Sequence, residues 1–185
     1  IAAKEGLLEM VVFMVNESAQ VGIILDNISI PHAIISEADR PEILHYLFMR
    51  GAPLRHGDSI LHVGGLLENA LYHGRLETVK YLMHVQKMRF YEEDLPRYCP
   101  ISTVMQSAPK NALDLISFCL GEGAFVNGYP GYSPLHIAVI SGDCECVKLL
   151  LSHGADVNDP DENGKTPIQT AREMRDVEMI KILSA

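Results

Sequence analysis

Lysine and arginine are scarce in this chain. Only 15 of its 185 residues are basic, against 24 aspartates and glutamates, which gives a formal net charge of −9. A nucleic-acid surface needs clustered lysine and arginine to neutralise phosphates, so this balance argues against a nucleic-acid partner. The acidity permits a protein partner with a basic segment, but it is also the ordinary outcome for an intracellular protein.

Long apolar runs are also lacking. The stretch 7–15 is apolar, but Glu9 interrupts it and it falls well short of the roughly 20 residues that a membrane helix needs. We therefore expect no insertion into a membrane. We also expect no secretory signal, because Ile1 already lies within a helical pattern, and the missing start methionine and helix cap suggest a fragment of a longer protein.

The four cysteines show no arrangement suited to metal binding. Cys144 and Cys146 are two residues apart on a predicted helix and point in different directions, and no paired zinc spacing occurs. Cys119 and Cys146 fall on apolar helix positions, which predicts packing in the core. Free thiols suit a reducing compartment, so we expect a cytoplasmic or nuclear protein without a metal or other cofactor.

Recognisable catalytic motifs are missing as well. The sequence contains no nucleophile elbow, phosphate loop or metal-binding helix motif. His73 beside Tyr72 is a lone imidazole next to a phenol, which does not form a catalytic set. We therefore predict that the chain is not an enzyme. A small-molecule or catalytic pocket near Tyr72 and His73 remains as an alternative.

The most informative segment that is present runs from residue 133 to residue 158. Ser133 can cap a helix and Pro134 suits its first turn. His136 follows early in that helix, and the small Gly142 would let a second helix approach closely. An apolar face on that second helix then leads to Gly154, where a left-handed residue is needed. The segment predicts a helix, a turn, a second helix and a hairpin.

The same pattern recurs along the whole chain. Residues 166–169 repeat the opening 33 residues after 133–136, residues 102–105 form a degenerate opening, and residues 69–82 match well. Aligning each copy on the position of His136 gives anchors near 0, 33, 68, 105, 136 and 169, so that Met105 and Gln169 replace the imidazole. The spacing is close to the period of about 33 residues that is typical of ankyrin repeats.

The chain resembles the ankyrin-repeat family in this motif and in its period. The resemblance implies an all-α solenoid of about six stacked helix–turn–helix units with projecting β-hairpin loops, in which His136 bonds to neighbouring backbone. We expect one domain, 1–185, that lacks the start of its first repeat. The expected units are 1–25, 26–57, 58–97, 98–128, 129–161 and 162–185.

Ankyrin arrays usually bind proteins through the hairpin tips and the concave face of the first helices, and the resemblance assigns residues to both. The concave row includes Tyr72, His73, Lys110, Ile140 and Ser141, together with Lys4, Glu5, Glu37, Glu173 and Met174. The tips include Tyr98, Tyr129, Tyr132, Asp161, Glu162 and Lys165. Tyrosines at adjacent tips favour a binding hot spot, although Tyr129 could instead pack its own turn. The acidic tip at Asp161 and Glu162 could steer a basic partner or simply be a solvated turn.

A longer connection replaces the usual glycine turn at residues 85–99. It carries Phe90, Tyr91 and Tyr98 between Arg89 and Arg97, a composition typical of interfaces if the rings are exposed. The other interpretation is that these rings cover the ends of neighbouring helices.

The resemblance thus implies a non-catalytic scaffold, adaptor or inhibitor that binds a protein partner, and we expect it to be a monomer. The alternative is a targeting domain within a larger enzyme or ubiquitin-ligase complex.

Overall fold

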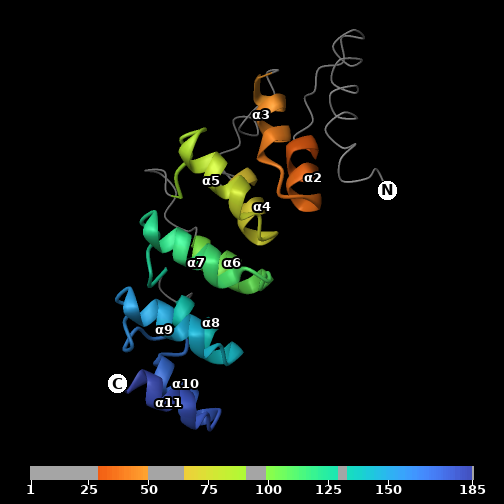
Figure 1. The fold of residues 1–185 in the computed structure, drawn as a ribbon. Coiled ribbons are helices and arrows are strands. Elements are labelled where there is room, and N and C mark those ends of the chain that lie inside the picture. Colours follow the sequence, from red (N-terminus) through yellow and green to blue (C-terminus); the bar gives the residue numbers. More distant parts are fainter. Residues whose placement is uncertain (1–28, 50–64, 91–98, 129–132, 185) are drawn as a thin grey trace.

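The computed structural model describes residues 29–49, 65–90, 99–128 and 133–184. The described residues form ten α-helices, arranged as five successive pairs in one stack (Figure 1). The pairs are α2 (Ser29–Glu37) with α3 (Pro41–Met49), α4 (Gly65–Tyr72) with α5 (Leu76–His84), α6 (Pro100–Ser107) with α7 (Ala112–Gly121), α8 (Pro134–Ser141) with α9 (Cys144–Ser152), and α10 (Pro167–Glu173) with α11 (Val177–Leu183). The predicted all-α repeat architecture is therefore confirmed. The predicted unit 1–25 lies outside the described residues.

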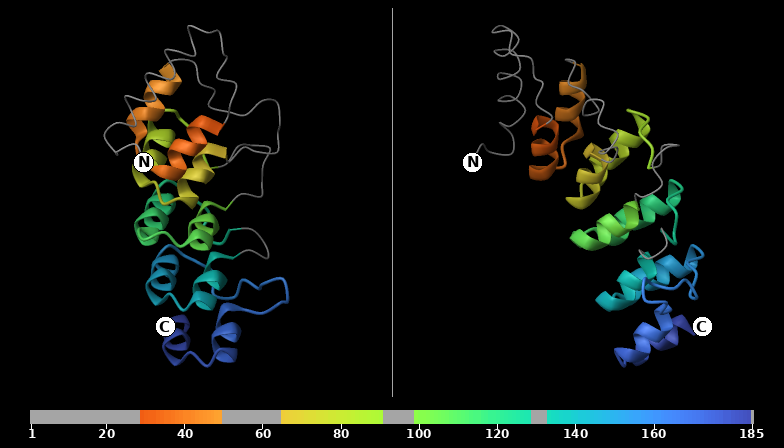
Figure 2. Two further views of the ribbon diagram at one scale, coloured as in Figure 1. Left: turned by 90° about the vertical axis from the view of Figure 1, so that its right-hand side faces the viewer. Right: turned by 180° about the vertical axis from the view of Figure 1, so that it is seen from behind.

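The five pairs pack through two parallel rows of helices. The first helices form one row, in which α2, α4, α6, α8 and α10 each contact the next. In the second row, α3 contacts α5, α7 contacts α9, and α9 contacts α11. Two further views show the pairs displaced progressively into a curved stack (Figure 2). This arrangement buries a continuous core between neighbouring repeats, as expected for a solenoid. None of the helices in these five pairs is long and apolar enough to cross a membrane.

The core is built from the same positions in each pair. In α9 the buried face consists of Cys146, Val147 and Leu150, which recur at the three- and four-residue spacing of an amphipathic helix. Cys119 in α7 is also fully buried, so the predicted core packing of both thiols is confirmed. Burial raises the pKa of Cys119 and of Cys146 to about 12, which keeps both thiols protonated at neutral pH.

A residue in the left-handed backbone conformation ends the first helix of four pairs. Gly74, Ala108, Gly142 and Arg175 have φ values of 72°, 44°, 70° and 58° and are spaced 34, 34 and 33 residues apart. A Cβ on Gly142 would meet nothing within 4 Å, so the expectation that this glycine admits a close helix is wrong. Its backbone conformation is the physical reason for glycine there. Gly154, with φ of 85°, confirms the left-handed turn predicted after α9.

These turns correct the alignment of the middle repeat. Ala108 lies six residues after Ser102, as Gly142 does after His136, so Ser102 and not Met105 occupies the imidazole position. Pro100 likewise begins α6 as Pro134 begins α8. The prediction for Met105 is wrong because three extra residues, 109–111, lengthen the turn between α6 and α7. Counting backwards from the second helix therefore gives a position three residues too late.

The three-residue insertion packs against the preceding repeat. The Asn111 side-chain amide donates to the carbonyl of Gly74 at 3.0 Å. Pro109 and Asn111 come so close to Gly74 that a Cβ placed there would lie 2.7 Å from the Cβ of Pro109. The insertion thus closes over the turn that ends α4, and only glycine leaves it room.

A reciprocal pair of contacts joins the first two described repeats. The carboxylate of Asp39 accepts hydrogen bonds from the backbone amides of Glu77 and Thr78, at 3.0 and 2.8 Å, and so caps α5 from outside its own repeat. In return, the Arg75 guanidinium donates to the carbonyl of Ile35 at 2.7 Å and to that of Ser36, at the end of α2. Each side chain satisfies helix-end groups that lack partners within their own helix.

Asp39→Ala is expected to lower the free energy of unfolding by about 1.5 kcal/mol, because it removes both caps of α5. Urea denaturation monitored by circular dichroism measures the loss. Asp39→Asn is the matched control, since its carbonyl oxygen retains one acceptor, and it should recover about half of the lost stability. If alanine and asparagine cost the same, the two hydrogen bonds are not the source of the stability.

Candidate protein-binding surface

Eight residues form a repeated row at the ends of the first helices. They are the two residues that precede each left-handed residue, and we call them the turn row: Tyr72, His73, Gln106, Ser107, Ile140, Ser141, Glu173 and Met174. All are exposed except Ser107, which is half-buried. Their backbone positions are fixed by the short connection that follows each helix, so their side chains project from a rigid support.

Three large apolar side chains stand out in the turn row. Tyr72, Ile140 and Met174 expose 52%, 61% and 48% of their surface. The other five large apolar side chains that are exposed in the described part of the chain lie on or after second helices. Tyr72 and Ile140 lie two residues before the left-handed residue of their repeats and Met174 lies one residue before it, so the three side chains belong to one surface at the ends of α4, α8 and α10. Such a row can provide the apolar anchors of a protein interface.

Tyr72 and His73 lie side by side at the end of α4. Their ring centroids are 5.3 Å apart and their planes meet at 80°. Tyr72 and His73 border a shallow hollow of about 270 Å³ that is also lined by Gly65, Glu68 and Asn69. None of the described residues that line the hollow is a serine, threonine or cysteine that could act as a nucleophile beside the imidazole. Its described lining combines a carboxylate, a carboxamide, a phenol and an imidazole.

The structure moves one predicted residue out of this row and adds another. Lys110 does not occupy the row, because it belongs to the insertion after α6, where its side chain is exposed. The turn-row position of that repeat is held by Gln106. The signal that identifies Gln106 is Pro100, which aligns with the helix-starting Pro134 and Pro167.

The hairpin before α10 holds three further predicted residues. The Asp161 carboxylate accepts from the amides of Asn163 and Lys165 at 2.8 and 2.9 Å, and the Asp161 amide donates to the Lys165 carbonyl. The Lys165 amide, and then that of Asn163, hold the pKa of Asp161 below its usual value. Lys165 Nζ pairs with Glu173 at 2.8 Å. Asp161 thus shapes the hairpin, whereas Glu162 is exposed.

The other predicted tips are Tyr98, Tyr129 and Tyr132, and they lie outside the described residues. Phe90 belongs to the same connection, 85–99, as Tyr98. It is described, and it is only 7% exposed. The interface interpretation of this ring is therefore wrong, and the ring covers the ends of neighbouring helices. Burial of a phenyl ring without a polar group is favourable, which explains the placement.

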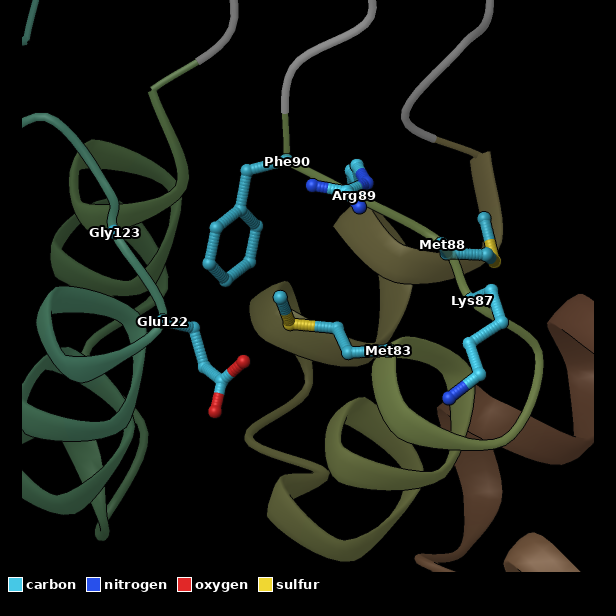
Figure 3. A pocket seen from close by; sticks show the side chains of 7 residues that line it. All are labelled: Met83, Lys87, Met88, Arg89, Phe90, Glu122 and Gly123. Carbon is cyan, nitrogen blue, oxygen red and sulfur yellow. The ribbon is translucent and has the colours of Figure 1, made fainter.

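Phe90 forms part of a cavity of about 450 Å³ between α5 and α7 (Figure 3). The side chains of Phe90, Met83 and Glu122 are directed into the space between them. Glu122 is held by His84, whose Nε2 lies 3.0 Å from the carboxylate oxygen, and this contact bridges α5 and the end of α7. Lys87, Arg89, Met88 and Gly123 complete the lining. The mixture of two cations and one carboxylate does not favour one ligand charge.

His136 has a structural place in the fold. It is buried in α8, and its Nε2 lies 2.8 Å from the carbonyl oxygen of Lys165, to which the ring donates. The predicted bond to neighbouring backbone is therefore present, and it reaches into the next repeat. Ser133 holds the N-cap position of α8, but its side chain makes no capping hydrogen bond. Among the described residues, no group of histidine, cysteine, aspartate and glutamate could hold a metal ion.

Comparison with known proteins gives short regions of similarity. Ankyrin repeat domain-containing protein 13B of Mus musculus is 42% identical over 53 residues, which cover 29% of this chain and 8% of the relative. Protein phosphatase 1 regulatory subunit 27 of Mus musculus is 54% identical over 41 residues, covering 22% of this chain and 27% of the relative. ARF GTPase-activating protein GIT1 of Homo sapiens is 40% identical over 73 residues, which cover 39% of this chain and 9% of the relative.

The chain thus spans 27% or less of the length of these curated relatives. A family model described as ankyrin repeats in three copies matches residues 104–185. The match begins inside α6 and covers the rest of that helix and α7 to α11, including the left-handed turns that repeat after 34 and 33 residues. The same helix pair and the same stacking continue through α2 to α5. Residues 104–185 are thus ankyrin repeats by the family match, and the helix pairs α2–α3 and α4–α5 continue the same repeat architecture.

Proposed function

We propose that this chain is a non-catalytic protein–protein interaction module that binds its partner through the turn row and the neighbouring hairpin tips. The observation that carries the proposal is the exposure of Tyr72, Ile140 and Met174 at the C-terminal ends of three first helices, α4, α8 and α10. Because the supporting turns are fixed by hydrogen bonds and packing, the backbone that carries these side chains loses little conformational entropy on binding. The module would act as a monomeric scaffold, adaptor or inhibitor.

The partner would be a protein with a basic segment. The formal net charge of −9 supports this choice, because an acidic surface attracts such a segment and accelerates association. A reducing compartment, cytoplasmic or nuclear, is part of the same proposal. It is supported by the four cysteines, all of which are free and lie within the described residues.

A second candidate is a targeting module within a larger protein. The observation that favours it is the small share of the relatives that the chain covers. The similar regions amount to 9% of ARF GTPase-activating protein GIT1 and 9% of 2-5A-dependent ribonuclease of Mus musculus, whose names include catalytic activities. In this case the same surface would select the substrate of a neighbouring catalytic domain.

The test compares two triple alanine variants, each of which truncates three exposed apolar side chains. Tyr72→Ala/Ile140→Ala/Met174→Ala removes the apolar side chains of the turn row. Val85→Ala/Leu113→Ala/Val177→Ala is the control, because these side chains are 56%, 40% and 65% exposed but lie on or next to second helices. Proteins that bind the immobilised chain are identified by quantitative mass spectrometry, and the affinity of the purified partner is then measured for each variant.

The turn-row variant is expected to weaken binding at least about tenfold, whereas the control retains its affinity. Both variants should melt within a few degrees of the parent chain, because all six side chains are exposed. Equal losses in the two variants would contradict the proposal. A third variant with Tyr98, Tyr129 and Tyr132 replaced by alanine tests the hairpin tips separately, and a large stability loss with unchanged affinity would assign those tyrosines to turn packing.

A further inference from the structure

The first-helix row carries a one-sided charge in its earlier repeats. Helices α2, α4 and α6 contain two carboxylates, Glu37 and Glu68, and no lysine or arginine. Both carboxylates are exposed. Arg75, in the turn after α4, is occupied by the carbonyls of Ile35 and Ser36. Among the described residues, these three helices therefore present two carboxylates and no lysine or arginine of their own to offset them.

Glu68 is exposed at a repeat position that is buried in α8. It aligns with His136, which is buried and bonded to the next repeat, yet Glu68 is exposed and lines the hollow beside Tyr72 and His73. Tyr72 lies one helical turn beyond Glu68, so the carboxylate and the phenol ring share one face of α4. The position that fixes the fold in α8 is thus available for ligand contact in α4.

A carboxylate beside an exposed aromatic face is suited to a cation. The carboxylate supplies charge, and the ring attracts an ammonium or guanidinium group through its quadrupole. Asn69 adds a carboxamide, and the volume of about 270 Å³ is sufficient for the end of one long side chain. A planar guanidinium can stack on the ring while it donates to the carboxylate, which favours arginine over lysine.

We propose that the hollow formed by Glu68, Asn69, Tyr72 and His73 binds an arginine side chain of the partner's basic segment. The proposal rests on the proposed function, since it names the chemistry that one part of the turn row recognises. Anchoring of one arginine here would fix the register of the partner along the row, because the hollow is confined to a single repeat. The apolar side chains of Ile140 and Met174 would then contact residues further along the same segment.

The positive charge of Lys110 is expected to repel an arginine bound in this hollow. Lys110 stands between Pro109 and Asn111, both of which contact Gly74, the residue that directly follows His73. Lys110 is exposed, so a positive charge follows the turn that closes over Gly74, although it belongs to the next repeat. Replacement of Lys110 by glutamine should strengthen arginine binding by about twofold, since repulsion between exposed charges is weak.

The experiment titrates the full chain with N-acetyl-arginine amide and follows backbone amides by two-dimensional nuclear magnetic resonance. N-acetyl-citrulline amide, which has nearly the same shape without the charge, is the matched probe. Arginine should produce saturable shifts at Gly65, Asn69, Tyr72 and His73 in the millimolar range, because exposed cation contacts are individually weak. Citrulline should leave these signals in place.

Two substitutions of equal charge separate a site from general attraction to an acidic chain. Glu68→Gln should weaken arginine binding at least fivefold, whereas Glu145→Gln, on the exposed face of α9, should leave it unchanged. Equal weakening by both substitutions, or equal shifts with citrulline, would overturn the arginine site. If arginine fails while the turn-row variant still loses its partner, the site is wrong and the proposed function stands.

Discussion

Replacement of Gly74 by alanine is expected to lower the free energy of unfolding by about 3 kcal/mol. The backbone φ of 72° alone makes an L side chain unfavourable by about 1–2 kcal/mol. In addition, the new Cβ would lie 2.7 Å from the Cβ of Pro109 and 2.8 Å from Oδ1 of Asn111. Neither neighbour can yield easily, because the proline ring is rigid and the Asn111 amide is bonded to the Gly74 carbonyl.

Gly142→Ala is the matched control for this effect. Gly142 has nearly the same φ, 70°, and ends the first helix of its repeat in the same way, but a Cβ there would meet nothing within 4 Å. The control should therefore cost only the backbone term, about 1 kcal/mol. The difference between the two variants isolates the close packing of the three-residue insertion on the preceding repeat.

Urea denaturation measures both variants, followed by circular dichroism and by tyrosine fluorescence. Two probes are needed because repeat arrays can unfold in more than one step. If Gly74→Ala and Gly142→Ala cost the same, the insertion does not pack on the Gly74 turn. A loss for Gly74→Ala that disappears in a chain lacking residues 109–111 would support the contact directly.

The extent to which the fold follows from the sequence is limited by this same insertion. The α8–α9 repeat was predictable because each of three residues has a separate structural role. Pro134 begins α8, His136 bonds to the next repeat, and Gly154 takes the left-handed conformation after α9. The middle repeat was misaligned, since Ala108 takes a left-handed conformation without being glycine and so leaves no sequence signal. Ordinary propensity gives little warning of a strained residue that tertiary packing holds in place.

The candidate surface was predictable only where the repeat was regular. Tyr72, His73, Ile140 and Ser141 lie at the expected helix ends, because their distance from the turn glycine is constant. Lys110 was assigned to the row by the misalignment. The role of Asp161 in shaping its hairpin depends on backbone amides that turn toward its carboxylate, and sequence spacing alone does not distinguish this role from that of a solvated acidic tip.

His136→Ala is expected to lower the free energy of unfolding by about 2.5 kcal/mol. The substitution leaves a cavity at a side chain that is only 5% exposed, and it removes the hydrogen bond of 2.8 Å to the Lys165 carbonyl. The carbonyl keeps one partner, because it also accepts from the Asp161 amide, and this limits the loss. Thermal and urea denaturation measure the effect.

His136→Gln separates the lost hydrogen bond from the lost volume. Glutamine can donate from its amide to the same carbonyl, and it naturally occupies this position in α10 as Gln169. There, however, the Gln169 oxygen accepts from the Thr166 amide at the start of its own helix. If glutamine at position 136 recovers about half of the lost stability, the bond to the next repeat is the main contribution of the imidazole. Equal losses for alanine and glutamine would assign the effect to packing.

Hydrogen exchange then decides whether His136 also organises the binding surface. The Lys165 carbonyl accepts hydrogen bonds from both the His136 imidazole and the Asp161 amide. Helix α8 is therefore bonded to the hairpin that presents Glu162 and Lys165. In His136→Ala the amides of Asp161 and Lys165 should exchange at least about tenfold faster, because the hairpin opens without unfolding the helices. Unchanged protection would show that the Asp161 carboxylate alone holds the hairpin. Faster exchange would mean that a residue buried in one repeat preorganises the tip of the next, so that stability and affinity are lost together.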